Sequence, residues 1–207
     1  MIEIVTKSNA HKHQGLLSSF FRLRYEVFVE RLGWDLDCPD GLERDQFDAE
    51  DATYLLLPNG QGETVAGARL IAMDRPGLLN SVFPFLVAGE MPCSPDIWEV
   101  TRLVVDHRKE RLEGCGNAGG KLLTGLLEFG VLTDLSHLVS VSDVCIERIL
   151  RRAGWTTKRL GAVHRIGHGD VAAEIQPASP QVLAECRRRN GIKGSVFSVM
   201  EKLKEAV

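Results

Sequence analysis

The sequence predicts a single α/β domain whose mixed, mainly antiparallel sheet is flanked by helices. Three observations predict this fold class. Segments that alternate like strands are interspersed with segments whose apolar residues recur with a helical period. The length of 207 residues suits one domain, and no repeat or linker divides the chain. Apolar residues make up 44% and charged residues 26% of the chain, which excludes a collagen-like or disordered protein.

The N-terminal part begins with a strand and an amphipathic helix. Residues 2–6 alternate and are rich in β-branched side chains, which predicts a strand, and the apolar spacing in residues 13–31 predicts a helix. Residues 32–52 are polar and acidic and contain Pro39 and Gly41, so we expect a long loop. Unstructured loops of this length are usually functional or disordered. Because this loop holds a tryptophan, a phenylalanine and several carboxylates, we expect it to be functional.

The remaining elements follow from hairpin, glycine and periodicity signals. Strands at 53–57 and 63–73 flank a Pro-Asn-Gly turn. A glycine cluster precedes a helix expected at 121–132. The other predicted elements are a short helix or turn at 78–87, a strand at 98–105, a short buried strand at 138–141, a helix at 144–153, strands at 155–160 and 171–176, a helix at 180–190 and a further helix in the tail.

The charge is unevenly divided along the chain. The net charge of −3 does not indicate nucleic-acid binding. Residues 1–103 hold 9 basic and 16 acidic residues, whereas residues 104–207 hold 16 basic and 12 acidic ones. An acidic half and a basic half suggest partners of opposite sign.

Cysteine usage and hydropathy predict a cytoplasmic protein that does not enter membranes. The five cysteines are widely spaced and form no C-x-x-C pair, which argues against a disulfide framework or a zinc site. No apolar signal-peptide region follows the initial methionine. The longest uncharged stretch, residues 76–89, is shorter than the roughly 20 residues that a membrane-spanning helix needs.

The most informative pattern is a cluster of charged and aromatic residues between positions 24 and 102. Its members are Arg24, Phe28 and Trp34, then Glu43, Asp45 and Asp48 in the polar loop, then Arg69, Glu99 and Arg102 in strands. Charges in apolar strands are costly to bury unless they are paired. Glu99 and Arg102 point to opposite faces of an ideal strand, so a β-bulge between them would be needed to bring both to one site. Taken singly, each of these residues is also consistent with an ordinary structural role. The charged residues would be solvated or form a structural ion pair, such as Arg69 with Glu99, and the aromatic residues would belong to the core.

Taken together, these positions resemble the LuxI-type N-acyl-homoserine lactone synthases. The resemblance is carried by FRLRYEVFVERLGW (21–34), ERDQFD (43–48), AGARL (66–70), SVFPFL (81–86), WEVTRLVV (98–105) and ILRRAGW (149–155), and it spans about residues 1–160. The ten positions that match the family signature are Arg24, Phe28, Trp34, Glu43, Asp45, Asp48, Arg69, Phe83, Glu99 and Arg102.

The resemblance implies a fold similar to the GCN5-related acetyltransferases and a specific acyl transfer. The amine of S-adenosylmethionine would attack an acyl thioester, and the carboxylate would then close on its own γ-carbon. Methylthioadenosine and an acyl-homoserine lactone, a bacterial quorum-sensing signal, would be released. S-adenosylmethionine would thus be a consumed substrate, and neither a cofactor nor a metal is expected. One domain, residues 1–207, would hold a substrate half at about 1–105 and an acyl-donor half at about 106–207.

The residue chemistry suggests a role for each position. Aromatic faces attract cations, so Trp34 and Phe28 suit the sulfonium. Asp45 and Asp48 can hold the ammonium, while Arg24, Arg69 and Arg102 can hold the carboxylate or pair with the acidic residues. Glu99 is the expected general base, directly or through one water, with Arg102 beside it. The acyl-donor side is assigned to Phe83, to the backbone of Leu103 or Val104 as an oxyanion donor, and to the Ser142 hydroxyl.

Several alternatives remain open at the level of sequence. The acyl donor is either acyl carrier protein, usual in the family, or a coenzyme A thioester. A related N-acyltransferase that does not lactonise is the rival enzyme, and a non-catalytic sensor is the rival binding protein. The glycines before Lys121 fit a phosphate cradle or a flexible loop, and the basic residues at 108–121 and 148–159 fit a dock for an acidic donor or ordinary surface. Ser142 fits either a ligand contact or a helix cap.

Overall fold

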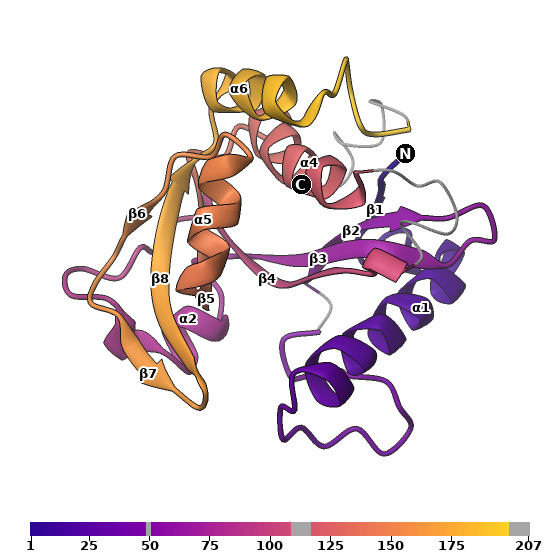
Figure 1. The fold of residues 1–207 in the computed structure, drawn as a ribbon, viewed down its shortest axis with the longest axis horizontal. Helices are drawn as coiled ribbons and strands as arrows, with labels where there is room; N and C mark the ends of the chain where they lie inside the picture. Colours follow the sequence, from indigo (N-terminus) through magenta and orange to yellow (C-terminus); the bar gives the residue numbers. More distant parts are fainter. Residues whose placement is uncertain (49–50, 109–116, 199–207) are drawn as a thin grey trace.

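The computed structural model describes residues 1–48, 51–108 and 117–198 (Figure 1). Its strands are β1 (Glu3–Val5), β2 (Thr53–Pro58), β3 (Thr64–Ala72), β4 (Ile97–Val105), β5 (His137–Asp143), β6 (Lys158–Arg159), β7 (His164–Ile166) and β8 (Gly169–Pro177). Its α-helices are α1 (Gln14–Arg24), α2 (Leu78–Ser81), α4 (Ala118–Leu132), α5 (Val144–Arg152) and α6 (Pro180–Asn190). Short 3₁₀ turns lie at η1 (Ala10–Lys12) and η3 (Pro84–Leu86), and a π-helical segment, η2 (Tyr25–Arg31), follows α1.

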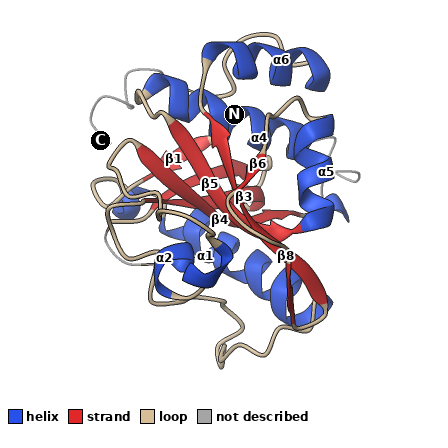
Figure 2. Ribbon diagram, turned by 90° about the vertical axis from the view of Figure 1, so that its left-hand side faces the viewer, coloured by secondary structure: helices blue, strands red, loops and turns tan. Residues whose placement is uncertain are grey.

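In the described part of the chain the strands form one eight-stranded sheet, ordered β1-β2-β3-β4-β5-β8-β6 with β7 beside β8. All pairs are antiparallel except β4 with β5, which confirms the predicted mixed, mainly antiparallel sheet. Helix α1 packs on one face, and α4 with α6 lies on the other (Figures 1 and 2). The largest apolar cluster fills the space between the sheet and α4, and a second one lies beneath α1.

The sheet separates into two halves along the β4–β5 boundary. These strands pair only from Ile97 opposite His137 to Val100 opposite Ser140. Beyond that point β4 stays paired with β3 as far as Val105, and β5 stays paired with β8. The two halves run in clearly different directions in Figure 1. A parallel pair that ends early leaves its strands unpaired beyond Val100 and Ser140, and we call this separation of β4 from β5 the opening.

A β-bulge in β4 lies at the start of this opening. The β3–β4 register shifts between Gly67, opposite Val104, and Arg69, opposite Thr101, so two residues of β4 face one residue of β3. Arg102 has a positive φ of 52°, which is uncommon for a residue with a side chain. The bulge turns Arg102 to the same face as Thr101. A bulge was predicted between positions 99 and 102, and the structure has it one step later, at residues 102 and 103, with Glu99 to Thr101 in regular register.

Most predicted elements are confirmed, and four differ. The helix expected at 13–31 changes from α to π geometry at Tyr25. Helix α4 begins at Ala118, because the Asn117 side chain caps it, and Gly119 and Gly120, expected before the helix, form its first turn. The strand expected at 155–160 is shorter than predicted and consists of β6 alone, because Trp155 is buried in the core instead of belonging to the sheet. Strand β7 was not predicted. The tail helix lies outside the described residues.

No helix within the described residues is long and apolar enough to cross a bilayer.

Replacing Gly67 by alanine is expected to destabilise the fold by about 1–3 kcal/mol through overpacking. A Cβ at this position would lie 2.8 Å from the Phe20 ring and from Leu56, both of which are fully buried and have little room to move. Urea unfolding measures the change in free energy. As a control, Gly60 has open space around it, so G60A should stay within about 0.5 kcal/mol of the parent. An equal effect of both substitutions would contradict the packing argument.

Candidate active site

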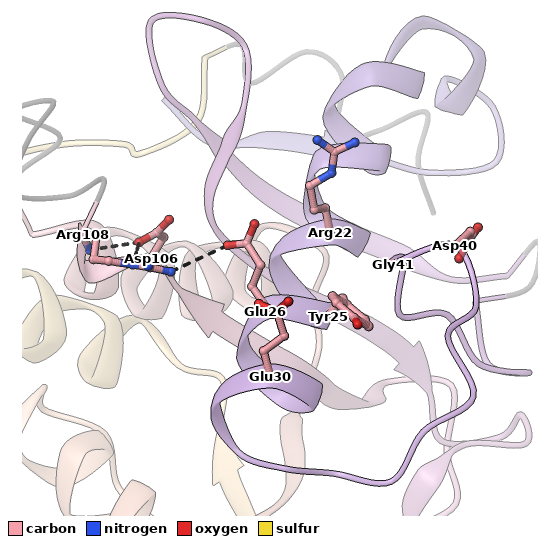
Figure 3. Close-up of a pocket in the computed structure, with 8 residues that line it drawn as sticks. All are labelled: Arg22, Tyr25, Glu26, Glu30, Asp40, Gly41, Asp106 and Arg108. Atoms are coloured by element: carbon pink, nitrogen blue, oxygen red, sulfur yellow. Dashed lines mark hydrogen bonds and ion pairs between the residues drawn. The ribbon is translucent and has the colours of Figure 1, made fainter.

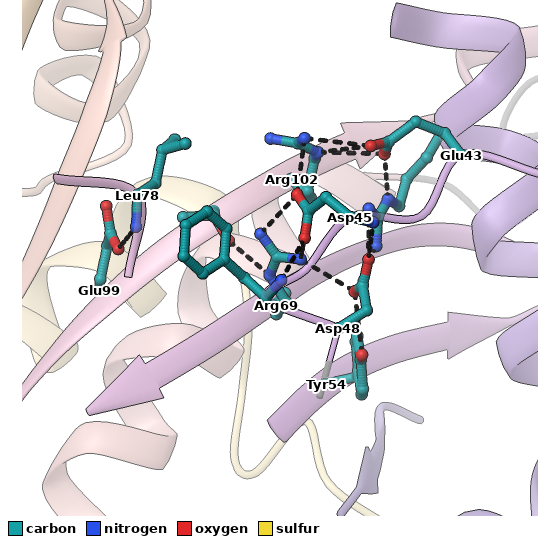
Figure 4. Close-up of polar contacts among 11 residues, drawn as sticks. Glu43, Asp45, Asp48, Tyr54, Arg69, Leu78, Glu99 and Arg102 are labelled. Atoms are coloured by element: carbon teal, nitrogen blue, oxygen red, sulfur yellow. Dashed lines mark hydrogen bonds and ion pairs between the residues drawn. The ribbon is translucent and has the colours of Figure 1, made fainter. Parts of the chain in front are cut away.

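Three arginines, two of them fully buried, and three carboxylates from distant parts of the chain meet on the α1 face of the sheet (Figure 4). Arg24 ends α1, Arg69 lies in β3 and Arg102 occupies the bulge of β4. The carboxylates, Glu43, Asp45 and Asp48, all come from the polar loop that follows η2. The sequence-based clustering of these residues is therefore confirmed, and the loop is anchored by its acidic side chains.

Arg24 and Arg69 are each held by paired hydrogen bonds. The Nε of Arg24 donates to Glu43 Oε2 over 2.5 Å, and its two terminal nitrogens donate to the Asp48 oxygens over 2.7 and 2.8 Å. Arg69 donates to the two Asp45 oxygens over 2.5 and 3.1 Å, and its Nε donates to Thr101 Oγ1 over 3.0 Å. Both arginines have a solvent exposure of 0%. Bidentate pairing of this kind is the geometry in which a buried guanidinium is best compensated.

Arg102 joins this network to the aromatic pair. It donates to Glu43 from Nε over 3.0 Å, and its Nη2 lies 2.7 Å from Asp45 Oδ2. Phe28 and Trp34 stack with ring centroids 4.6 Å apart, and the Arg102 guanidinium carbon lies 5.5 and 5.8 Å from these centroids. The aromatic faces assigned to a sulfonium thus already carry a cation. Likewise, the aspartates assigned to an ammonium are paired with arginines.

The network fixes the ionisation of its members. Burial acts to lower the pKa of Arg24, but its hydrogen bonds and charge interactions with Asp48 and Glu43 raise that pKa above the ordinary value. Burial acts to raise the pKa of Asp48, but Arg24 and Arg69 lower it to about 2. Tyr54, whose hydroxyl donates to Asp48 over 3.0 Å, has a raised pKa because of its burial and the adjacent carboxylate. All these groups therefore keep their charge states across the neutral range.

Glu99 lies apart from the arginines, at the closed end of the opening between β4 and β5 (Figure 4). It is fully buried, and its two oxygens accept hydrogen bonds from the backbone nitrogens of Leu78, over 2.7 Å, and Leu79, over 2.8 Å. Burial raises its pKa to about 6, although these two hydrogen bonds act in the opposite direction. The alternative that Arg69 forms an ion pair with Glu99 is wrong, since Arg69 donates to Asp45 and Thr101.

Sequence reasoning missed the residues that hold Glu99. Gly77 is required next to it, because a Cβ there would lie 2.5 Å from Glu99 Oε2. The nearest sequence signal is the Pro-Gly pair that precedes the short helix α2. Tyr54 was also missed, and the signal was a tyrosine among the leucines of β2.

The residues assigned to the acyl donor lie on both faces of the sheet, and three of them belong to the separated parts of β4 and β5. Phe83 packs in an apolar cluster on the same face as Glu99. Val104 is buried beneath α1, whereas Leu103 packs toward α4, and both lie in the separated part of β4. Ser142 lies in the separated part of β5, where its Oγ is buried without a hydrogen-bond partner among the described residues. The opening therefore has polar and apolar borders.

Only part of the predicted basic dock lies within the described residues. Lys109, Arg111 and the glycines at 114 and 116 lie outside the described residues. Arg151 and Arg159 both form ion pairs with Glu147, so one of their two positive charges is compensated there.

A separate groove of about 710 Å³ lies beside α1 and η2 (Figure 3). It is lined by Arg22, Tyr25, Glu26, Glu30, Asp40, Gly41, Asp106 and Arg108. Arg108, from the predicted basic dock, is among them, but no residue of the arginine–carboxylate network is, so this groove is distinct from that network.

Known proteins match this chain in sequence and in fold. The model of the autoinducer synthase family matches residues 8–184. The acyl-homoserine-lactone synthase of Rhizobium radiobacter is 35% identical over 187 residues, which cover 86% of each chain. The solved structure of MesI, a CoA-dependent acyl-homoserine lactone synthase, superposes with a TM-score of 0.85 at 31% identity and covers 96% of this chain and 99% of its own.

Two further structures bear on substrates and fold. BjaI, a CoA-dependent acyl-homoserine lactone synthase solved with SAM and isopentyl-CoA, has a TM-score of 0.85 at 27% identity and covers 99% of both chains. An acetyltransferase of the GNAT family from Staphylococcus aureus shares the fold alone, with a TM-score of 0.52 at 12% identity over 86% of this chain and all of its own. The expected acetyltransferase-like fold is confirmed. With a family match that spans most of its length, the chain belongs to the autoinducer synthase family and is an acyl-homoserine-lactone synthase.

Proposed function

We propose that this synthase joins S-adenosylmethionine to the acyl group of a coenzyme A thioester. The observation that carries the proposal is the opening between β4 and β5, which begins beside a buried carboxylate and an arginine-rich network. The similarity to a structure solved with SAM and isopentyl-CoA supports both substrates. S-adenosylmethionine is consumed in this reaction, and no cofactor takes part.

The reaction proceeds in two substitutions. Glu99 accepts one proton from the substrate ammonium and releases it to solvent, and the resulting amine attacks the thioester carbonyl. The C–S bond breaks, and the second proton lost from the nitrogen passes to the departing coenzyme A thiolate. The substrate carboxylate then attacks its own γ-carbon, the C–S bond to the sulfonium breaks, and neutral methylthioadenosine departs. A backbone N–H of Leu103 or Val104 stabilises the carbonyl oxygen during the first substitution.

The arginine–carboxylate network supports substrate positioning in this scheme. Trp34 is 44% exposed and stacks on Phe28, so the pair offers one open aromatic face to the sulfonium. Asp45 is the most exposed acid of the network, at 13% of its side chain, and is the best placed to meet an ammonium. Arg24, Arg69 and Asp48 hold the loop that carries Asp45.

The test is to incubate purified protein with S-adenosylmethionine and matched acyl donors on coenzyme A and on acyl carrier protein. We expect an acyl-homoserine lactone and an equal amount of methylthioadenosine with the coenzyme A thioesters. Lactone formed only from acyl carrier protein would overturn the donor assignment. Acyl transfer without methylthioadenosine would support the rival N-acyltransferase that does not lactonise.

The rate should depend on pH through Glu99. Because a base must be ionised, kcat/KM is expected to fall about tenfold per pH unit below a pKa of about 6. The same shift also affects stability. The pKa of Glu99 in the folded protein exceeds the ordinary 4.5, so Glu99 contributes to the stability of the fold below pH 4.5 and loses that contribution as the pH rises through 6. A pH profile of kcat/KM measures the first effect, and a profile that stays flat from pH 5 to 7 would contradict it.

A further inference from the structure

Tyr54 is a buried tyrosine that contacts the arginine–carboxylate network but takes no part in the chemistry described so far. Its ring packs beneath α1, where it makes T-shaped contacts with Phe20 and Phe21 at centroid distances of 5.9 and 6.1 Å. The residue is 7% exposed and lies directly opposite Arg69 in the β2–β3 pairing. Two strands and two aromatic neighbours therefore fix the direction of the Tyr54 hydroxyl.

The Tyr54 hydroxyl shares one carboxylate oxygen with two arginines (Figure 4). It donates to Asp48 Oδ1 over 3.0 Å, and the same oxygen lies 2.7 Å from Nη1 of Arg24 and 3.0 Å from Nη1 of Arg69. Burial and the adjacent carboxylate raise the pKa of Tyr54, so the hydroxyl stays protonated and remains a donor. Since one carboxylate oxygen has about two lone pairs, these three donors compete, and the hydroxyl limits the hold of Asp48 on Arg69.

Asp48 in turn fixes the chain turn that carries Asp45. Its Oδ2 accepts from the backbone nitrogen of Asp45 over 2.9 Å, and its own backbone nitrogen donates to the carbonyl of Asp45 over 3.0 Å. Asp45 binds Arg69 through both carboxylate oxygens and is the acid that the proposed function places beside the substrate ammonium. A continuous chain of hydrogen bonds thus leads from the Tyr54 hydroxyl through Asp48 to Asp45.

We propose that Tyr54 is a positioning residue for S-adenosylmethionine, which acts through Asp48 on Asp45 and so controls the affinity for the amino-acid part of this substrate. This inference rests on the proposed function. Without the hydroxyl, Asp48 Oδ1 can move toward Arg69, and the contact between Arg69 and Asp45 weakens. Asp45 then loses the orientation in which it meets the ammonium. Glu99 lies outside this chain of hydrogen bonds, so the chemical step should be spared.

The first test is the kinetics of Tyr54→Phe, which removes the hydroxyl and keeps the ring that packs on α1. We expect KM for S-adenosylmethionine to rise about tenfold, the lower end of what a hydrogen bond to a charged group contributes. The kcat value should stay within about twofold of the parent, because a rise in KM at constant kcat indicates lost binding alone. KM for the coenzyme A thioester should not change.

The second test separates positioning from a general distortion of the fold by comparing three ligands in calorimetric titrations. S-adenosylmethionine and S-adenosylhomocysteine both carry the ammonium and the carboxylate, and only the first has a sulfonium. Methylthioadenosine lacks the amino-acid part altogether. Tyr54→Phe should weaken the first two ligands about equally and leave the dissociation constant of methylthioadenosine unchanged, which also shows that the variant is folded.

Tyr25→Phe is the matched control, because Tyr25 is the other tyrosine of the chain and lines the separate groove beside α1. It should leave KM and all three dissociation constants unchanged. Equal losses for all three ligands in Tyr54→Phe would overturn the inference, since Tyr54 would then only stabilise the fold.

Unchanged affinities in Tyr54→Phe, or a fall in kcat without a rise in KM, would also overturn the inference and leave the proposed function standing. If the parent protein formed no lactone from S-adenosylmethionine and any coenzyme A thioester, the proposed function would fail, and the inference with it. The activity of the parent protein therefore distinguishes the two failures.

Discussion

Replacing Glu99 by glutamine is expected to lower kcat/KM for lactone formation by about 10²–10⁴-fold, the usual contribution of a general base. Glutamine keeps the size of the side chain but does not accept a proton. Release of coenzyme A thiol and of methylthioadenosine measures the rate. The residual activity should also lose its dependence on ionisation near pH 6, because that dependence is assigned to Glu99.

A structural role for Glu99 makes a different prediction. Its two oxygens accept from Leu78 and Leu79, so it also fixes the start of α2, and glutamine would leave one of these donors unpaired. We expect a loss of about 1–3 kcal/mol in the free energy of unfolding for that reason. Asn80→Ala is the control, since the Asn80 side chain accepts from Gly77 and donates to Arg75 in the same turn. If N80A lost as much activity as E99Q at equal stability, Glu99 would be a positioning residue.

The sequence predicted this site well where residue types alone determine it. Buried arginines need carboxylates, so Arg24 and Arg69 imply the acids of the polar loop. The strand pattern around Glu99 and Arg102 required a bulge, and the structure has one. The chemistry of a closed charge network can thus be inferred before its geometry is known.

The partners within the network could not be predicted from the sequence. Two readings were open for Asp45 and Asp48, substrate ammonium or protein arginine, and both fit the same residue types. The choice depends on distances between a loop and two strands, which no local pattern encodes. The partners of Glu99 were even harder to predict, because they are backbone nitrogens 21 and 20 residues earlier in the chain. Backbone donors leave no trace in residue identity.

The acyl-donor side was the least predictable. Ser142 was recognised as a hydroxyl in a buried strand, but Glu174 was not, because a single acid in an alternating strand is typical of a solvent-facing residue. Burial of that position comes from α5, which packs across β5 and β8. The isolated strand pattern therefore predicts the wrong exposure for this residue, and only the packed fold shows that it is buried.

Replacing Arg24 by alanine is expected to destabilise the fold by about 3–5 kcal/mol, the usual result of removing one partner from a buried ion pair. Arg24 makes three of the hydrogen bonds in the network, and its loss leaves Glu43 and Asp48 short of a cation at 1% and 5% side-chain exposure. The magnitude should lie near the lower end, because Arg102 still contacts Glu43 and Arg69 still contacts Asp48. Urea unfolding at pH 7 measures the change.

The loss of unfolding free energy should be much larger for an arginine of the buried network than for an arginine in a surface ion pair. Arg75→Ala removes an ion pair whose side chains are 55% and 61% exposed, and it should cost less than about 1 kcal/mol. Lysine at position 24 should recover only part of the loss, because one ammonium does not reproduce the paired contacts to Glu43 and Asp48. If R24A and R75A proved equally mild, the carboxylates would have to be reached by solvent, and the loop from Leu32 to Asp48 would not be anchored by Arg24. A large loss for R24A together with a small one for R75A would instead show that the acidic loop is held in place by the charges that it buries.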